Sequence, residues 1–383
     1  MSRFFIVAGK RTPQGRFLGK LSQYSAVDLA VAAGEKALSG IDPSAIDLVI
    51  VGNILSAGQG MNIARQIGIK LGVPVDRTAF TVNMMCASGL WSIILAAQAI
   101  KTGEASVVLC GGTESMSNAP YLLERMRQGY KLGDGAVVDS ILRDGLVDSF
   151  DHQHMGITAE RLAKEYNISR TEQDIFAEVS QRRYAEAASA GHFDAEMITM
   201  NELDSDEHPR PDTTLEHLAS LKPVFDEKGS VTAGNASGIN DGAAILVVCS
   251  EEALSEHNWD PLAEVGAWAS VGCDPKYMGL GPVYATRKLC ALNGDEVDQF
   301  DKIEINEAFA VQTLVCMKEL NLDAEKVNQE GGAIALGHPV GASGARLAIH
   351  LAHRIQSGNI QKGLASLCVG GGMGVAVTLQ HVS

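Results

Sequence analysis

Short stretches from the first half of the chain return, in the same order, in the second half. The matched pairs are residues 47–53 with 301–307, Val82-Asn83 with Val327-Asn328, Ser88-Gly89 with Ser343-Gly344, and Cys110-Gly111-Gly112 with Cys368 and its glycines. Such a repeat indicates a duplicated unit in which strands alternate with helices. The sequence therefore predicts a layered α/β architecture with mainly parallel central strands. Equivalent junctions of the two halves should meet near a pseudo-twofold axis.

The length and composition fit an enzyme of this kind and disfavour other classes of protein. A chain of 383 residues exceeds the usual size of one core, so two or three subdomains are expected. A formal net charge of −15 argues against nucleic-acid binding. No apolar run reaches membrane-spanning length, and the first residues enter a strand pattern without a signal-peptide or transit pattern. The seven cysteines stand in mostly apolar surroundings without metal-ligand spacing, which favours a cytoplasmic protein with no metal.

A cysteine lies where a strand pattern changes into a helix pattern. Residues 79–82 read as a short strand, and residues 90–100 are apolar nearly all round, which is typical of a helix inside a core. Cys86 would then lie at the start of that helix, where free N–H groups and the helix dipole favour a thiolate. We therefore expect a lowered pKa and a nucleophilic role. The alternative is a buried structural cysteine, a common fate of free thiols.

Two more reactive side chains lie in glycine-rich turns. Cys368 follows a buried strand pattern and precedes Gly370, Gly371, Gly372 and Gly374. Such glycines let the backbone approach a ligand and present N–H groups to an oxyanion. His338 stands between glycine runs, before a proline and another helix pattern. A loose turn and a solvated histidine are the alternatives. Together with Cys86, these residues indicate a nucleophile, an acid/base group and oxyanion donors.

The region between the two halves has a different character. Residues 117–238 carry more charge and interrupt the alternation of strands and helices. We expect helices over 158–166 and 171–190, the second capped by Thr171 with Asp174 three residues on, and an extended loop over 207–212. An insertion beside an active site favours a substrate-binding lid or platform, with oligomerisation as the alternative. The expected division is 1–116 with 239–258, then the inserted 117–238, then 259–383.

Seven motifs, in order along the chain, resemble those of the thiolase family, most closely its biosynthetic members, and the resemblance runs nearly from end to end. They are residues 83–89, 111–121, 154–160, 232–238 and 306–310, the segment around His338 and the segment around Cys368. The resemblance implies a duplicated five-layer α-β-α-β-α core with an inserted loop domain. It also implies reversible Claisen condensation of two acetyl-CoA to acetoacetyl-CoA and CoA through an acyl-cysteine, in a ping-pong mechanism.

By this resemblance, Cys86 is the acylated nucleophile and Cys368 is the acid/base that moves protons to and from CoA or the substrate α-carbon. His338 helps to activate Cys86 and, with a water held by Asn306, stabilises the thioester enolate. The backbone N–H groups of Cys86 and Gly370 form a second oxyanion hole. Such chemistry requires a positioned base and donors aimed at the developing oxyanion.

The resemblance also implies a binding channel for coenzyme A. Arg210 would lie beside the adenine. The pantetheine arm would contact Leu146, Phe225, Ala233, Ala236 and Ser237, and the thioester end would be surrounded by His154, Met155, Met278, Ala308 and Phe309. Coenzyme A thioesters are then substrates, and no cofactor is permanently bound. A homotetramer built as a dimer of dimers is expected.

Other functions are compatible with parts of the sequence. A degradative 3-ketoacyl-CoA thiolase of broader range would differ in the depth of its pocket. A ketosynthase shares this architecture, but it would carry a histidine where Cys368 stands. An inactive paralogue that merely binds acyl-CoA predicts the loss of a catalytic group, whereas Cys86, Asn306, His338 and Cys368 are all present.

Overall fold

The computed structural model describes residues 2–200, 203–358 and 360–382. Within these ranges, a 10-stranded sheet has the order β10-β11-β12-β9-β1-β8-β5-β3-β4, with β2 paired to β8. Its strands are β1 (Phe4–Arg11), β2 (Gly15–Arg16), β3 (Leu48–Gly52), β4 (Thr78–Val82), β5 (Val107–Ser115), β8 (Asn240–Ser250), β9 (Ala263–Gly272), β10 (Lys302–Ile305), β11 (Lys362–Val369) and β12 (Met373–Gln380).

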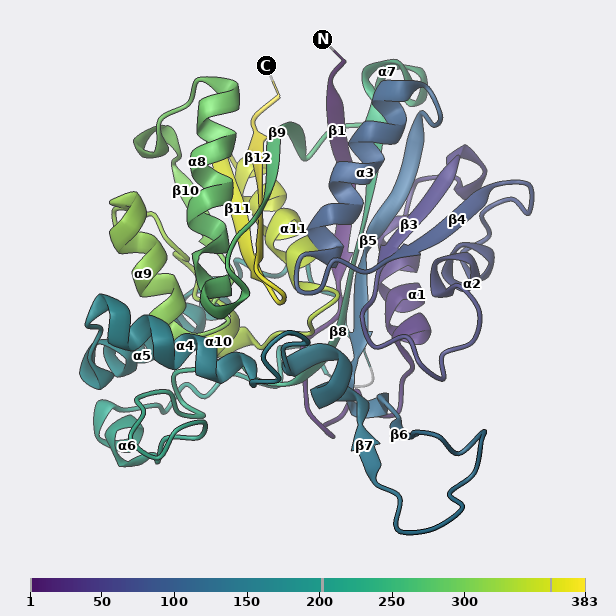
Figure 1. Cartoon of the computed structure of the whole chain (residues 1–383). Coiled ribbons are helices and arrows are strands. Elements are labelled where there is room, and N and C mark those ends of the chain that lie inside the picture. The colour runs from purple at the N-terminus through teal and green to yellow at the C-terminus, as the bar shows by residue number, and fades with distance from the viewer. Residues whose placement is uncertain (1, 201–202, 359, 383) are drawn as a thin grey trace.

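The sheet folds around two central helices, so that the chain forms five layers (Figure 1). Strand β1 pairs with β9 only at Phe5 and Ile6, which makes this contact a seam between two half-sheets. Between the half-sheets lie α3 (Ser88–Thr102) and α11 (Ser343–Gln356), which share one apolar core with both. The outer helices are α1 (Ala26–Ala37) and α2 (Ile63–Lys70) over one half-sheet, and α8 (Gly281–Asn293) and α9 (Ala310–Leu320) over the other. The predicted duplicated five-layer core is confirmed.

The strand directions correct one prediction. Parallel pairing occurs between β3 and β4, β3 and β5, and β10 and β11. The strands in the middle of the sheet, β8, β1, β9 and β12, pair antiparallel. The expectation of mainly parallel central strands is therefore wrong. The physical reason is visible at β12, which follows β11 through a short turn, because a short turn returns the chain antiparallel whereas parallel strands need a long crossover.

Two glycines allow the central helices to meet at their N-terminal ends. A Cβ atom added to Gly344 on α11 would lie 2.5 Å from the backbone N of Leu90 on α3. A Cβ atom added to Gly89 on α3 would lie 2.8 Å from the backbone N of Ala345 on α11. Both distances are far below ordinary contact, so only glycine permits this approach. The loops that precede these two helices are consequently brought side by side.

The inserted region follows β5 and ends at β8. It contains a hairpin of β6 (Tyr121–Leu123) and β7 (Val137–Asp139), a π-helical turn at Ile141–Leu146, and the helices α4 (Met155–Tyr166), α5 (Arg170–Ser189) and α6 (Leu215–Ser220). The hairpin projects from the body of the molecule, while α4, α5 and α6 lie at the same end of the core as α10 (Ala333–Leu336) (Figure 1). The short helix α7 (Glu251–His257) follows β8. The domain boundaries stated above remain a prediction.

Two helix starts in the inserted region differ from expectation. Helix α4 begins at Met155, before the expected 158, because the side chain of His154 caps it by accepting from the N–H of Gly156. Helix α5 is capped by Ser169 in a reciprocal capping box with Glu172. The expected cap of Thr171 with Asp174 is wrong because the equivalent Ser-x-x-Glu pattern begins two residues earlier.

One stretch, Met85–Thr102, has the length and mean hydropathy of a membrane span, although no such run was expected from the sequence. It coincides with α3, and 61% of it is buried inside the protein. Such a helix is explained by its place between the two half-sheets, because a helix that is apolar all round can be buried in a large core.

Candidate active site

A cavity of about 410 Å³ opens between the central core and the inserted region. It brings together residues from distant parts of the sequence, and every side chain assigned above to catalysis or substrate binding, apart from Asn306, lines it. These residues are Cys86, Leu146, His154, Met155, Arg210, Phe225, Ala233, Ala236, Ser237, Met278, Ala308, Phe309, His338, Cys368 and Gly370. Asn306 lies behind this lining, in contact with His338.

Cys86 lies in the turn between β4 and α3, as the sequence predicts. The preceding Met85 adopts a left-handed backbone conformation with φ of 48°, and Ser88 ties the turn together by accepting from the N–H of Met84. The backbone N–H groups of Gly370 and of Cys86 itself donate toward the sulfur. Two backbone donors therefore converge on this sulfur, which fits the predicted oxyanion hole at Cys86 and Gly370.

The expected lowering of the Cys86 pKa is wrong. Burial raises the pKa of this thiol, and it outweighs the opposing effect of the two N–H donors. The helix terminus has the effect expected from the sequence, but the surrounding apolar pocket disfavours the thiolate more strongly. The thiol therefore needs a base to become a nucleophile.

His338 lies in the loop between α10 and α11, and three contacts fix it. Its backbone N–H donates to Oδ1 of Asn240 at 2.9 Å, Nδ1 of its ring lies 2.6 Å from Oγ of Ser343, and Nε2 lies 3.4 Å from Nδ2 of Asn306. Burial, followed by the positive charge of Arg346, lowers the pKa of His338 to about 4. The ring is consequently neutral at physiological pH and can accept a proton.

Ser343 lets the imidazole change its protonation state. Its Oγ lies 3.0 Å from the carbonyl oxygen of Pro339, so the hydroxyl can donate there while accepting from Nδ1–H of His338. The same hydroxyl can instead donate to an unprotonated Nδ1. Nε2 can therefore present either a lone pair or a proton to the cavity.

Cys368 stands near the end of β11, and the turn after it requires glycine. Gly371 and Gly372 have φ values of 84° and 82°, and a Cβ atom on Gly372 would lie 2.4 Å from the carbonyl oxygen of Cys273. Burial raises the pKa of Cys368 well above its ordinary value, and the proximity of Cys86 adds to this effect. Cys368 is thus a buried thiol whose conjugate base would be strong.

Asn306 follows β10 directly. Its backbone N–H donates to the carbonyl oxygen of Ser366 at 3.0 Å, which fixes it beside β11. Its side-chain Oδ1 is buried and has no hydrogen-bond partner among the residues that the structure describes. An amide with one end on His338 and a free acceptor at the other fits the predicted role of holding a water, since buried polar atoms normally have a partner.

The wider part of the cavity is mostly apolar. The ring of Phe225 stacks on His154 at 4.5 Å and meets Phe309 edge-on at 6.2 Å. Arg210 lies at the lining, and its backbone N–H donates to Gln181 on α5. A long, mostly apolar channel with a cation in its wall suits a chain-like substrate that carries phosphate.

Several lining residues were not found from the sequence: Met116, Gly145, His208, Val224, Thr232, Gly238, Ile239 and Val340. Most are neighbours of identified residues, so proximity in the chain could have suggested them. His208 is the most informative of these residues, because burial lowers its pKa to about 4 beside Arg210. Its only signal was its position two residues before Arg210.

A buried carboxyl group also supports the site from behind. Glu114 on β5 accepts hydrogen bonds from the side chain of Asn53 at 2.8 Å, from the backbone N–H groups of Ile54 and Leu55, and from that of Gly341 in the His338 loop. Burial raises its pKa to about 7. Glu114 thereby ties the loop after β3 to the loop that carries His338.

Comparison with known proteins agrees with the fold and the site. The model of the thiolase N-terminal domain matches residues 4–252, and that of the thiolase C-terminal domain matches residues 259–381. The chain therefore belongs to the thiolase family and is a thiolase acyltransferase. It is 48% identical to an acetyl-CoA acetyltransferase of Escherichia coli, with complete coverage of both chains, and 46% identical to one of Pseudomonas aeruginosa, with 99% of each chain covered.

Solved structures give the same result. Human mitochondrial 3-ketoacyl-CoA thiolase in complex with CoA superposes with a TM-score of 0.98 at 44% identity, covering 100% of this chain and 98% of that one. The acetyl-CoA acetyltransferase of Bacillus anthracis superposes with a TM-score of 0.96 at 42% identity, covering 100% of this chain and 99% of that one. The relatives thus include both acetyltransferases and a 3-ketoacyl-CoA thiolase.

Proposed function

We propose that the protein condenses two acetyl-CoA molecules reversibly to acetoacetyl-CoA and CoA, through an acetyl group carried on Cys86. One observation carries the proposal: a partly buried thiol, a fully buried thiol, a neutral histidine and two converging backbone N–H donors line a single cavity. The names of the bacterial relatives support acetyl-CoA as the substrate.

In the first half-reaction, Nε2 of His338 takes the proton of Cys86, and the thiolate attacks the carbonyl carbon of acetyl-CoA. The N–H groups of Cys86 and Gly370 bind the oxyanion, an interaction that is strong in a dry pocket. The bond between the acyl carbon and the CoA sulfur then breaks, and the departing CoA thiolate receives the proton of Cys368. The enzyme is left with an acetyl thioester, a protonated His338 and a Cys368 thiolate.

In the second half-reaction, the Cys368 thiolate removes a proton from the α-carbon of a second acetyl-CoA. Protonated His338 and a water held by Asn306 stabilise the enolate oxygen. The carbanion attacks the acetyl group, the bond to Cys86 breaks, and His338 returns its proton to the Cys86 sulfur. Both thiols and the imidazole regain their starting states. The raised pKa of Cys368 suits this step, because removing a proton beside a thioester needs a strong base.

Coenzyme A would enter along the inserted region. We place the adenine near Arg210 and His208, the pantetheine arm along Phe225 and Ser237, and the thioester between Met155 and Phe309. The relative solved in complex with CoA supports CoA as a ligand of this cavity. CoA thioesters are then substrates that come and go rather than resident cofactors.

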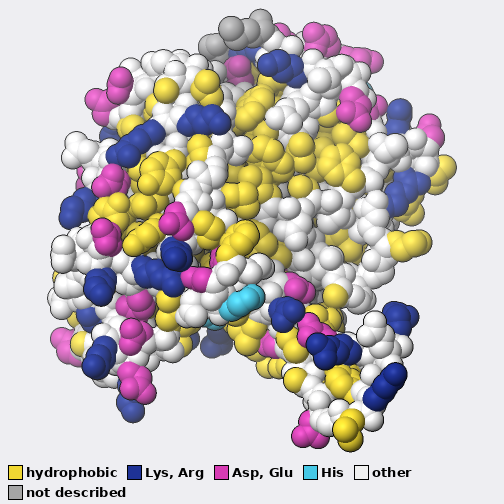
Figure 2. Space-filling view, viewed as in Figure 1, with side chains coloured by type: hydrophobic (Ala, Val, Ile, Leu, Met, Phe, Trp, Pro, Cys, Tyr) yellow, Lys and Arg dark blue, Asp and Glu magenta, His cyan; other side chains and the backbone are white. Residues whose placement is uncertain are grey.

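A homotetramer formed as a dimer of dimers completes the proposal. Apolar side chains gather over α3 in the middle of one face (Figure 2), and Trp91, Leu95 and Trp268 pack there only partly buried. A second apolar surface lies on the projecting β6–β7 hairpin, where Leu132 is 99% exposed. Two separate apolar surfaces suit the two different contacts of a dimer of dimers.

Thiolysis of 3-ketoacyl-CoA substrates of increasing chain length tests the proposed activity. We expect rapid CoA-dependent cleavage of acetoacetyl-CoA, far slower cleavage of 3-ketohexanoyl- and 3-ketodecanoyl-CoA, and no activity in a Cys86→Ala variant. Equal turnover of the longer substrates would instead assign the broader 3-ketoacyl-CoA activity named by the human relative. Absence of all turnover in folded wild-type protein would leave only binding of acyl-CoA.

A further inference from the structure

A row of buried charged side chains runs behind the active site between β10 and α11. On β10, Ile303 and Ile305 point into the apolar core under the outer helices, so Lys302 and Glu304 point the other way, as alternation along a strand requires. On α11, Ser343, Arg346, His350 and Arg354 are spaced three and four residues apart and therefore share one helix face. The two rows meet directly at Glu304 and Arg346, and Lys302, His350 and Arg354 share Glu330 as a partner.

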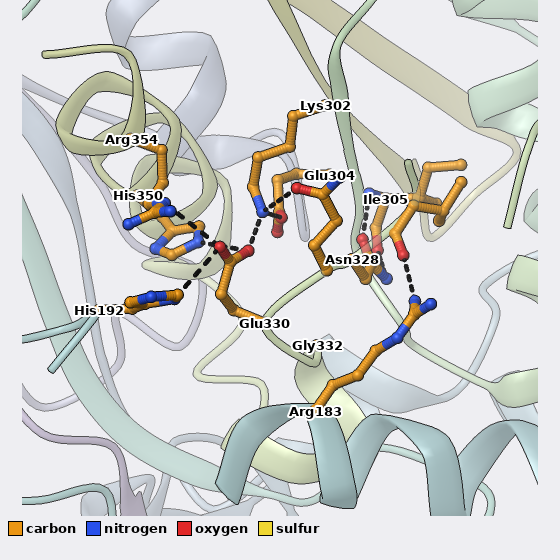
Figure 3. A network of polar contacts seen from close by, with 12 residues as sticks. Arg183, His192, Lys302, Glu304, Ile305, Asn328, Glu330, Gly332, His350 and Arg354 are labelled. Carbon is orange, nitrogen blue, oxygen red and sulfur yellow. Dashed lines mark hydrogen bonds and ion pairs between the residues drawn. The ribbon is translucent and has the colours of Figure 1, made fainter. Parts of the chain in front are cut away.

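The contacts follow one another from the far end of the row toward the cavity. Figure 3 shows the far part, where Lys302, His350 and Arg354 converge on Glu330. Next along the row, Lys302 lies 3.3 Å from Glu304, and Glu304 lies 3.6 Å from Arg346. The row ends at the cavity with Ser343 and Asn306, the two partners of the His338 ring.

The central part of this row does not serve to bind a cation. Glu304, Glu330 and His350 present atoms within 4.8 Å of one another, but the ammonium group of Lys302 lies among them. The row is also a poor device for stability, since Lys302, Glu304 and Arg346 are almost completely buried and the desolvation of buried charges offsets much of their attraction. For the Glu304–Arg346 pair at the cavity end of the row, a role in catalysis accounts for the buried charges better than a contribution to stability.

Within the row, Arg346 is the charged residue with the most direct link to the catalytic side chains. Nε and Nη2 of its guanidinium are buried without a hydrogen-bond partner among the described residues, and Glu304 approaches it only at 3.6 Å. The carboxylates of Glu196 and Glu307 also bear on this charge from farther away, but burial still lowers the pKa of Arg346, and the charge acts on the imidazole of His338. A fixed cation in a dry interior acts over a longer range than one in water.

We propose that Arg346, held by Glu304, is a positioning residue that keeps His338 in register with Asn306 and places a fixed positive charge behind them. This inference rests on the catalytic roles proposed above for His338 and Asn306. The charge favours a neutral imidazole in the resting enzyme, ready to accept the proton of Cys86. Once the ring is protonated, the same charge makes it a stronger acid toward the enolate and the departing Cys86 thiolate.

Few other charged groups bear on His338. Arg346 is on α11 and Glu304 on β10, while Glu114 on β5 contacts the His338 loop through Gly341. The thiols of Cys86 and Cys368 line the same cavity. The remaining partners of His338, which are Asn240, Asn306 and Ser343, are neutral. Arg346 is thus the cation whose removal should alter the protonation of this ring.

The test compares Arg346→Met, Arg346→Lys and Arg354→Met in the full-length protein. The rate of acetoacetyl-CoA thiolysis is measured between pH 5 and pH 9, with melting temperatures recorded alongside. For Arg346→Met we expect kcat to fall about 10- to 100-fold with KM changed less than about twofold, and the acid limb of the pH profile to move to higher pH. Arg346→Lys should restore the acid limb and most of the rate. Arg354→Met removes a cation that lies on the same helix face but farther from His338. This control variant should leave the rate and the acid limb unchanged.

The proposal is overturned if Arg346→Met and Arg346→Lys lose the same activity with an unmoved acid limb, because that result indicates packing alone. Wild-type kcat in Arg346→Met overturns it as well. If Arg346→Met does not fold, the Glu304→Gln variant tests the proposal instead, because it keeps the Arg346 guanidinium but removes the carboxylate that pairs with it. In Glu304→Gln, a lowered kcat supports the proposal if the acid limb of the pH profile lies at the same pH as in wild type or at a lower pH. An unchanged kcat in this variant contradicts the proposal. An inactive wild type would instead refute the proposed function itself.

Discussion

At the scale of single residues, the Ser343 hydroxyl is the least conspicuous part of the site and one of the most consequential. It lies 2.6 Å from Nδ1 of His338 and can serve either protonation state of the ring. A Ser343→Ala variant leaves Nδ1 buried without a partner, at a cost of about 1–3 kcal/mol. We expect kcat for thiolysis to fall about tenfold or more with little change in KM. Ser357→Ala, an exposed hydroxyl after the same helix, is the control. Equal rates in the two variants would contradict this role.

The roles of single residues were partly accessible from the sequence. Glycine-rich junctions in the sequence indicate reactive side chains at Cys86, His338 and Cys368. The roles of the other site residues came from the resemblance to thiolases. The direction of the Cys86 pKa shift was not accessible. A helix terminus is visible in a local pattern, but burial depends on side chains from the inserted region and from the second half of the chain, whose arrangement no local pattern contains. Arg346 and Glu114 escaped notice for the same reason.

At the scale of elements, the crossing of α3 and α11 sets the geometry of the cavity. Adding a methyl group at Gly344 would push α11 away from α3, because its Cβ would lie 2.5 Å from the backbone of Leu90. We expect Gly344→Ala to lower the free energy of unfolding by about 1–3 kcal/mol and to reduce kcat, since the His338 loop moves with the helix. Gly272→Ala is a suitable control, because the nearest atom to its Cβ would be 4.0 Å away. Wild-type stability and activity in Gly344→Ala would show that the helices can separate without harm.

Element types could be predicted from the sequence more successfully than element directions and boundaries. The apolar run of α3 and the strand before it were evident. The direction of β12 was not, because it depends on whether the glycine turn after Cys368 closes a hairpin or leads to a crossover. The cap of α5 was misplaced because both Ser169 and Thr171 are good capping residues, and only the contact with Glu172 distinguishes them.

At the scale of the whole molecule, His208 and His338 make the free energy of unfolding depend on pH. Burial lowers the pKa of His208 and of His338 to about 4 from an ordinary value of 6.5. The unfolded chain therefore binds these protons first, so their contribution is complete above about pH 6.5 and is lost as the pH falls toward 4. Each histidine should add a slope of up to ~1.4 kcal/mol per pH unit in this window.

Urea unfolding of wild type and His208→Gln between pH 4 and pH 7 measures this effect. Burial of Glu114 raises its pKa to about 7 and acts in the opposite direction, so the difference between the two proteins is the informative quantity. We expect the variant to lose less stability on acidification than wild type. Parallel curves would show that His208 titrates normally in the folded protein.

The proposed assembly gives a second prediction at this scale. Replacing Met126 and Leu132 on the β6–β7 hairpin, which are 59% and 99% exposed, by aspartate should convert tetramers to dimers in light scattering. Thiolysis should be retained, because neither residue lines the cavity. A tetramer that survives both substitutions would place the second contact elsewhere. In the sequence, these apolar side chains are scattered among the charged residues of the insertion. Only the folded structure shows that they lie together on one projecting hairpin.

The meeting of Gly89 with Gly344 also bears on how the chain acquires its chemistry during synthesis. The nucleophile belongs to the half that leaves the ribosome first, while its base, its acid and one of its oxyanion donors belong to the half that leaves last. Domains generally fold in the order in which they emerge. A nascent chain that stops before α10 therefore exposes Cys86 in an incomplete cavity and has no His338 to deprotonate it. The thiol gains its reactivity only when translation is nearly complete, so an unfinished chain carries no acyltransferase activity.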